Sequence, residues 1–333
     1  MYDVITLGET MLRLSPANGS RIEQATQFDI HVGGRESNTA VGLARLGHRV
    51  AWLSRLTDNS LGRMLAASIA AHGVDTQHVL WTSQDRIGTY YYESGSPPRH
   101  SQVIYDRQQS SFSRFSADML PAELFSEGSA RYLHFTGITL GLGATSQDMI
   151  AACVQRARIA GWKISFDVNY RAKLWDIRSA SQCCLEYLKD SDLVFLPIRD
   201  ARTLFGAGPA DASVDSRPEE AARQTLEALS QQSSAECIIL TLGKFGSAAL
   251  AGGQFYYRAT QPVAPIGRLG GGDAFSAGFL SAWLETRQVE RALRRGNAAA
   301  GLKYSMPGDL PYFPREEVTK LETQAFNEPQ HFR

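Results

Sequence analysis

The sequence predicts a three-layer α/β protein, in which a mainly parallel central sheet lies between helices and carries a small β lid. Short apolar runs alternate with segments of helical apolar spacing over most of the 333 residues. The apolar runs are continuous, which is typical of strands buried on both faces of a parallel sheet. Two stretches, within about 12–32 and 86–115, break this rhythm and are expected to form a separate sheet.

The expected elements alternate along the chain in the way that a parallel sheet requires. Helices are expected over Asn38–Leu46, from near Leu61, and after each later strand. Ala207–Glu219, rich in Ala, Asp, Ser and Pro, is expected to be a loop. No repeat or linker divides the chain, so residues 1–333 are expected to form a single domain. The strands of the main sheet are expected at Val4–Leu7, Val50–Leu53, Tyr132–Phe135, Lys163–Phe166, Leu193–Leu196 and Ile238–Leu242.

The two irregular stretches contain the pattern of hairpin strands. Polar and apolar residues alternate in Thr89–Glu93 and in Ser101–Tyr105. Ligands of open α/β sheets bind at the carboxyl ends of the strands, so a small sheet over that edge would act as a lid.

The composition is that of an ordinary globular protein without excess charge. Lys and Arg together number 34, as do Asp and Glu, so nothing favours a nucleic-acid partner. The four cysteines form no CxxC pair, which favours reduced thiols. The first residues lack the pattern of a signal peptide, and no apolar run of about 18 residues occurs. We therefore expect a cytoplasmic protein with no membrane partner.

The run Gly270-Gly271-Gly272-Asp273-Ala274-Phe275 has the composition of an anion-binding turn. Glycines let successive N–H groups turn toward an anion, and a helix that begins there adds its positive end. Asp273 would then be placed to accept a proton from a hydroxyl group. The alternative is structural: Asp273 is the N-cap of the helix, and the glycines form a tight turn.

Other nucleotide-binding motifs are missing from the sequence. No GxxxxGK[ST] occurs, and the motif set of protein kinases is absent. The first strand is followed by Gly8-Glu9-Thr10, where a dinucleotide-binding fold would have GxGxxG. A phosphate would therefore have to be held by a different device.

Several segments together resemble the ribokinase-like (PfkB-type) carbohydrate kinases. Gly33–Ala40 with Leu43–Gly47 is similar to the first signature of that family, and Gly270–Phe275 is similar to the second. The resemblance covers essentially the whole chain and implies a ribokinase-like α/β/α sandwich that transfers a phosphoryl group from ATP to a sugar hydroxyl. Similarity to the 2-keto-3-deoxygluconate kinase branch lies in Asp167–Trp175, Gly296–Ala299 and Leu302–Asp309.

The resemblance implies a catalytic role for the glycine run. Asp273 matches the base that takes the proton of the attacking hydroxyl, and Gly270, Gly271 and Gly272 match the anion hole for the transferring phosphoryl group. Gly34 and Asn38 match positions that meet substrate hydroxyls. The alternative for Asn38 is the N-cap of the helix after the Gly-Gly turn.

Further matches suggest that the sugar is an acid. Tyr90, Tyr105, Arg107 and Arg171 match lid and cleft positions that bind the keto acid in the branch. The arginine fork suits a carboxylate, because it donates two parallel hydrogen bonds. Kinases for neutral polyols commonly have Asp where this chain has Arg13, and arginine cannot accept from hydroxyls. The alternative for Arg13 is an exposed side chain on a lid strand.

The nucleotide is assigned by the same resemblance. The segment Thr241-Leu242-Gly243-Lys244-Phe245-Gly246 is similar to the strand and turn that approach the ATP phosphates, which points to Thr241, Gly243 and Gly246. Asn297 matches a position in the adenine pocket. The alternatives are an ordinary strand turn and a closely packed helix of small residues.

The chain departs from the family at three places. Gly267 stands where the family usually has an Asp that helps to bind a monovalent cation, which puts that cation site in doubt. Pro197 and Asp200 replace the family's Asn-x-x-Glu element, so Mg²⁺ is expected mainly through ATP phosphates and waters, with Asp200 as a candidate water-mediated contact. Arg35 replaces a small residue and could bind a carboxylate, obstruct the cleft or lie at the surface.

Three functions remain open from the sequence. The first is an ATP-dependent kinase for 2-keto-3-deoxygluconate or a related acidic keto sugar. The second is a kinase for a neutral sugar or nucleoside, such as fructose, ribose or adenosine. The third is a sugar- or nucleotide-binding homologue without turnover. A lid docked between subunits would make the protein a homodimer or a larger homo-oligomer.

Overall fold

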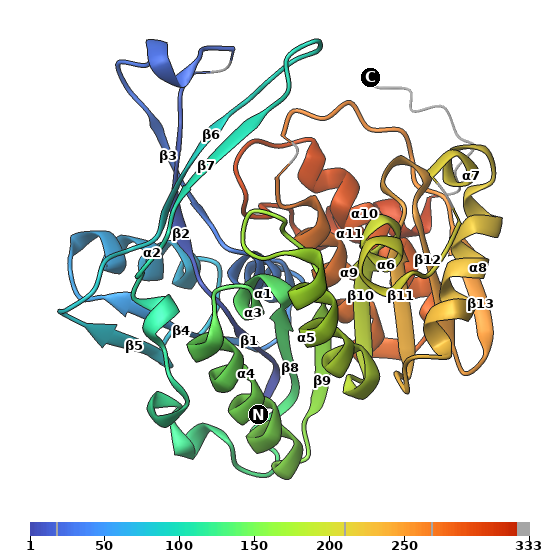
Figure 1. The fold of residues 1–333 in the computed structure, drawn as a ribbon, viewed down its shortest axis with the longest axis horizontal. Helices are drawn as coiled ribbons and strands as arrows, with labels where there is room; N and C mark the ends of the chain where they lie inside the picture. Colours follow the sequence, from blue (N-terminus) through green and yellow to red (C-terminus); the bar gives the residue numbers. More distant parts are fainter. Residues whose placement is uncertain (18, 210, 268, 325–333) are drawn as a thin grey trace.

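A computed structural model describes residues 1–17, 19–209, 211–267 and 269–324, and Figure 1 shows its fold. In this part of the chain the main sheet has the strand order β13-β12-β11-β10-β9-β8-β1-β4-β5. The strands from β11 to β5 are parallel, and β12 and β13 form an antiparallel hairpin at one edge. The strands are β1 (Tyr2–Leu7), β4 (Val50–Thr57), β5 (Val79–Thr82), β8 (Ala130–Thr136), β9 (Lys163–Asp167), β10 (Leu193–Pro197), β11 (Cys237–Thr241), β12 (Ser247–Ala251) and β13 (Gln254–Arg258).

Helices cover both faces of this sheet, as the continuous apolar runs predict. One core contains apolar residues of α4, α5, α6 and α8, and the other contains apolar residues of α1, α2, α9 and α10. The helices are α1 (Arg35–Arg45), α2 (Ser60–Ala70), α3 (Gly137–Leu140), α4 (Ala144–Ile159), α5 (Ile177–Asp190), α6 (Ile198–Phe205), α7 (Asp211–Ser216), α8 (Pro218–Ser230), α9 (Gly271–Thr286), α10 (Val289–Tyr304) and α11 (Arg315–Thr323).

Strand β10 shows how the two cores share one sheet. Successive side chains of a strand point to opposite faces. Val194 and Leu196 belong to the core under α4, α5, α6 and α8, whereas Leu193 and Phe195 belong to the core under α1, α2, α9 and α10. Each fully buried side chain of this size stabilises the fold by about 1.5–3 kcal/mol. The doubly buried sheet is therefore a rigid base for the loops at its carboxyl edge.

The predicted lid is a second sheet with the strand order β3-β2-β6-β7, and it projects from the body of the molecule in Figure 1. Its strands are β2 (Met11–Ser15), β3 (Asp29–Gly33), β6 (Thr89–Glu93) and β7 (Gln102–Asp106). Two antiparallel hairpins are joined by a parallel pairing between β2 and β6. Only Gly8-Glu9-Thr10 separates β1 from β2, so the lid is attached at the carboxyl end of a central strand.

The structure corrects two expectations about the second half of the chain. In place of the longer helix expected after β11, the chain forms only a short 3₁₀ helix at Gly243–Phe245, because Gly243 (φ 58°) and Gly246 (φ 99°) turn it back into the hairpin β12–β13. The loop expected over Ala207–Glu219 instead contains α7 and the start of α8, which has proline in its first turn.

Two further predictions concern the state of the cysteines and membrane-spanning helices. All four cysteines are free thiols, as expected. Within the described residues, no helix combines the length and the apolar character needed to cross a bilayer.

Candidate active site

The glycine run forms the start of α9, where backbone N–H groups lack helical partners. Gly270 is the N-cap residue with φ 77°, a left-handed conformation that favours glycine, and an added Cβ would lie 2.2 Å from the carbonyl oxygen of Asp309. The amides of the first turn have no partner within a helix, so they are available to an anion. The cap position belongs to Gly270, so the alternative that Asp273 is the N-cap is wrong.

Two cavities meet at this helix end. The first, here called the lid cavity, has a volume of about 110 Å³ and lies under β6 and β7. The second, here called the α10 cavity, has a volume of about 600 Å³ and lies between α10 and the turn after β11. Gly270 and Asp273 line the lid cavity, whereas Gly271 and Gly272 line the α10 cavity. A group bound in one cavity would therefore reach a group bound in the other through the first turn of α9.

Asp273 is buried at the floor of the lid cavity and is held by two residues of α1. Its Oδ2 accepts a hydrogen bond of 2.7 Å from Asn38 Nδ2, and its Oδ1 forms an ion pair with the Arg35 guanidinium. Burial raises the pKa of Asp273, and the Arg35 charge and the Asn38 hydrogen bond act in the opposite direction. The carboxylate is thus desolvated but supported, a setting that makes it a better proton acceptor than an exposed aspartate.

Asn38 also forms a hydrogen bond within its own glycine turn, at Gly34. Gly34 is the N-cap residue of α1, so the alternative of Asn38 as N-cap is wrong. The Asn38 Oδ1 nevertheless accepts from the Gly34 N–H at 3.4 Å while its Nδ2 donates to Asp273. One side-chain amide therefore connects the two glycine-rich turns.

Arg35 lies at the junction of the cavities. Its guanidinium reaches Asp167 at 3.5 Å as well as Asp273, and a Cβ added to Gly272 would lie 3.0 Å from Arg35 Nη2. Burial raises the pKa of Asp167 to about 7, although Arg35 opposes this shift. Of the three roles left open for Arg35, a surface position is wrong.

A second buried ion pair closes the lid side of the cavity. Arg13 on β2 pairs with Asp309 at 2.7 Å, and the Tyr90 hydroxyl on β6 donates to the same carboxylate at 2.7 Å. Arg13 is only 5% exposed, so the alternative of an exposed side chain is wrong. Asp309 lines the cavity. It therefore places a carboxylate close to the position at which this chain has Arg13 and kinases for neutral polyols commonly have Asp.

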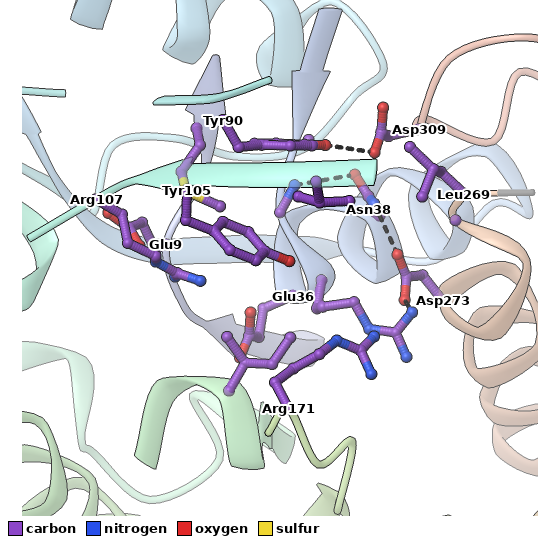
Figure 2. A pocket seen from close by; sticks show the side chains of 17 residues that line it. Glu9, Glu36, Asn38, Tyr90, Tyr105, Arg107, Arg171, Leu269, Asp273 and Asp309 are labelled. Carbon is purple, nitrogen blue, oxygen red and sulfur yellow. Dashed lines mark hydrogen bonds and ion pairs between the residues drawn. The ribbon is translucent and has the colours of Figure 1, made fainter. Parts of the chain in front are cut away.

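The other predicted lid and cleft residues also line the lid cavity. Figure 2 shows Tyr105 and Arg171 pointing into it from the lid and from the loop after β9. Arg107 is already ion-paired with Glu9, whereas Arg171 donates to the Tyr170 carbonyl at 3.1 Å. Burial and the neighbouring Arg35 charge lower the pKa of Arg171, so an anion bound beside it would relieve an unfavourable charge.

The residues predicted to hold a nucleotide line the α10 cavity. They are Thr241, Gly243, Gly246 and Asn297. Asn297 donates to the carbonyl groups of Arg258 (3.2 Å) and Ala259 (3.4 Å), which fixes its orientation. Ala300 and Gly301 keep this part of the wall free of large side chains, which leaves room for a flat ring. A cavity of this size and lining suits a nucleotide whose phosphates extend toward the start of α9.

Asp200 occupies a position with no free oxygen facing either cavity. It is fully buried, accepts from the Tyr170 N–H at 3.0 Å, and pairs with Arg199 at 3.0 Å. Its water-mediated contact with Mg²⁺ stays a prediction. Among the described residues, no group of three or more His, Cys, Asp or Glu side chains could hold a metal ion.

A buried carboxylate and the first-turn amides of α9 lie between a nucleotide-sized cavity and a small cavity lined by charged side chains. This arrangement is that of a phosphotransferase that acts on small molecules. The chain belongs to the pfkB family of carbohydrate kinases, whose model matches residues 1–312.

Individual relatives agree along nearly their whole length. The chain is 35% identical to the 2-dehydro-3-deoxygalactonokinase of Haloferax volcanii, covering 96% of each sequence. The crystal structure of 2-dehydro-3-deoxygluconokinase from Thermotoga maritima is 28% identical with a TM-score of 0.88, over 97% of this chain and all of the other. A putative ribokinase II from E. coli in complex with ATP and Mg²⁺ is 19% identical, with a TM-score of 0.82 over 96% of this chain and 99% of its own, and shares the fold.

Sequence reasoning missed several residues that shape the site. Glu9, Asp167 and Asp309 supply carboxylates in addition to those of Asp273 and Glu36, and Lys303 lies behind the glycine run. Glu9 in Gly8-Glu9-Thr10, Asp167 at the end of a strand and Asp309 after Gly308 all stand at strand ends or turns. Ligands of parallel sheets bind at the carboxyl ends of the strands, so polar residues at those positions could have been predicted to line the site.

Proposed function

We propose that the protein transfers the γ-phosphoryl group of ATP to a hydroxyl of an acidic keto sugar, 2-keto-3-deoxygluconate or its galactonate counterpart. The observation that carries the proposal is that Arg171, a half-buried arginine without a carboxylate contact in the described structure, points into the same small cavity as Asp273. A sugar acid would place its carboxylate on Arg171 and a hydroxyl at Asp273. The names of the two relatives support this substrate class.

In this proposal Asp273 takes the proton of the sugar hydroxyl as the oxygen attacks the γ-phosphate. The first-turn amides of α9 hold the equatorial oxygens of the transferring group, which carry much of the negative charge. Arg35 leaves one oxygen of Asp273 as the hydroxyl arrives and lies against the phosphoryl oxygens at Gly272. The new bond joins the sugar oxygen to phosphorus, the bond to the β-phosphate oxygen breaks, and ADP leaves.

Mg²⁺ would enter with ATP, because the described residues offer no cluster of metal-binding side chains. When bound, it neutralises charge on the phosphate oxygens. The α10 cavity would hold the adenine beside Asn297 and the phosphates beside Thr241 and Gly243.

A neutral sugar is the less supported substrate. A free carboxylate suits a polyol, because its two oxygens can accept from neighbouring hydroxyl groups. The Asp309 carboxylate lines the cavity, but Arg13 and Tyr90 already contact both of its oxygens. Fructose, ribose and adenosine also leave Arg171 without an anion.

A substrate panel tests the proposal. ADP release would be measured for 2-keto-3-deoxygluconate, 2-keto-3-deoxygalactonate, fructose, ribose and adenosine. We expect kcat/KM for one of the two acids to exceed that for every neutral substrate by at least 100-fold. A preference for a neutral substrate would favour the second function, and ATP binding without turnover on any sugar would favour a non-catalytic homologue. Assembly through the lid and a cytoplasmic location stay predictions.

A further inference from the structure

Lys303, near the end of α10, has a fully buried side chain behind the glycine run. Its ammonium group donates to the carbonyl oxygens of Met306 at 3.2 Å and Gly308 at 3.0 Å. These two carbonyls account for two of the three N–H donors of the lysine. The ammonium group is thus held by backbone carbonyl oxygens. A monovalent cation that has lost its water shell is bound by the same kind of oxygen atoms.

The position of Lys303 ties it to the anion-binding turn. A Cβ added to Gly270, the N-cap of α9, would lie 3.0 Å from Lys303 Cε. A Cβ added to Gly267 would lie 2.9 Å from the Met306 carbonyl oxygen that accepts from Lys303. The chain just before the glycine run is tied to the same place, since the N–H groups of Ile266 and Gly267 donate to the Tyr304 carbonyl.

Burying the charge of a lysine destabilises the folded state unless other interactions of the ammonium group compensate for the lost hydration. Burial lowers the pKa of Lys303 to about 8, and the Arg13 charge acts in the same direction, while Asp309 and Asp273 oppose it. His31 is a further titratable neighbour, because the Lys303 charge lowers its pKa. A methionine would fill the same space without desolvating a charge. Packing alone therefore does not explain the ammonium group.

We propose that the Lys303 ammonium is a built-in cation of the phosphoryl-transfer site and makes the protein independent of monovalent metal ions. Lys303 is a positioning residue: it fixes the carbonyls of Met306 and Gly308 and adds positive charge behind the turn that begins at Gly270. Potassium and ammonium ions are of similar size and both bind carbonyl oxygens, so the two can substitute for each other. The absence of a carboxylate at Gly267 fits this inference, because Lys303 already brings the charge that a free ion would supply.

The inference rests on the proposed kinase function and is tested with three variants. Lys303→Ala opens space beside the two carbonyls, Lys303→Met fills it with an uncharged chain, and Lys189→Ala on the exposed end of α5 is the matched control. ADP release is measured at pH 7 in choline chloride, KCl and NH₄Cl at equal ionic strength. Melting temperatures are measured for each variant in each salt.

We expect the wild type and Lys189→Ala to have the same kcat in all three salts. Lys303→Ala should lose at least 10-fold in kcat in choline chloride and regain at least half of the loss in KCl or NH₄Cl. Lys303→Met should lose as much and regain nothing. A wild type that K⁺ activates several-fold would overturn the proposal, whether or not the variants fold. So would an unchanged kcat of Lys303→Ala, or a loss that neither salt restores.

A wild type without turnover on any sugar would count against the proposed function alone. The affinity for ATP, measured by calorimetry in the same salts, then tests the inference without a sugar. We expect K⁺ to leave the Kd of the wild type unchanged and to tighten ATP binding by Lys303→Ala at least threefold. A wild-type Kd that depends on K⁺, or a Lys303→Ala variant indifferent to it, would overturn the role of Lys303.

Discussion

The guanidinium of Arg35 forms an ion pair with the carboxylate of Asp273 at the junction of the two cavities. Residue 35 is the first of α1 and Asp273 is in the first turn of α9, so two helix starts face each other. The Arg35 charge lowers the pKa of Asp273 against the effect of burial, but the ion pair also engages an oxygen that a base needs. A hydroxyl that enters the lid cavity and a phosphoryl group at Gly272 would draw the two partners apart.

Asp273→Asn is expected to remove turnover while leaving both ligands bound. Asparagine has nearly the same shape but cannot accept the hydroxyl proton, and a placed base typically contributes ~10²–10⁴-fold in rate. Calorimetry would measure ATP and sugar affinity beside kcat. A purified variant with near-normal kcat would show that Asp273 is not the base.

Arg35→Ala is expected to move the acidic limb of the pH–rate profile to higher pH. The base must be deprotonated, and the Arg35 charge lowers the pKa of Asp273 against the effect of burial. Without that charge the pKa rises further, so activity is lost at a higher pH as the solution is acidified. We also expect kcat at high pH to fall about 10²–10³-fold, as when one donor to a developing charge is removed.

The comparison variant for this profile is Arg35→Lys. It keeps a positive charge near Asp273 but loses the planar fork. Its acidic limb should stay close to that of the wild type, while its kcat falls. An Arg35→Ala profile that coincides with the wild type would mean that the ion pair has no influence on the base.

The sequence predicted the residues that line the site better than the pairs they form. The composition of the glycine run indicated Asp273, and the resemblance to the kinase family indicated Asn38 and Arg171; all three line the lid cavity. The partner of Arg13 could not be found in this way. Asp309 lies 296 positions further along, and only the folded lid brings the two side chains together (309 − 13 = 296).

The two incorrect fold expectations have a similar cause. The strand β11 has the apolar composition of its parallel neighbours, but the turn glycines that follow it lead into a hairpin. In Ala207–Glu219 the abundance of Ser, Asp and Pro suggested a loop, yet such residues are also favoured in the first turn of a helix. Composition over a few residues does not separate these outcomes.

Arg171→Ala is expected to weaken binding of the acidic sugar more than it slows the reaction. A hydrogen-bonded charge pair contributes about 1.5–3 kcal/mol, which corresponds to a rise in KM of about 10–150-fold. Any residual activity with a neutral sugar should not fall by this factor. Arg178→Ala, at an exposed position of α5, is the matched control. An equal loss for acidic and neutral sugars would contradict a carboxylate contact at Arg171.

Arg13→Met is expected to destabilise the protein by about 3–5 kcal/mol at neutral pH, because it leaves the buried Asp309 carboxylate without its cation. Arg13→Met with Asp309→Leu should recover much of this loss, since neither charge then remains.

The deficit of the single variant should also depend on pH. Burial raises the pKa of Asp309, Arg13 opposes this shift, and removal of Arg13 raises the pKa further. A raised carboxyl pKa means that the native state takes up its proton before the unfolded state does. The deficit of the single variant should therefore shrink as the pH falls toward 5. Urea unfolding at pH 7 and pH 5 would measure both effects, and a deficit that is the same at both pH values would rule out an unpaired Asp309 charge as its cause.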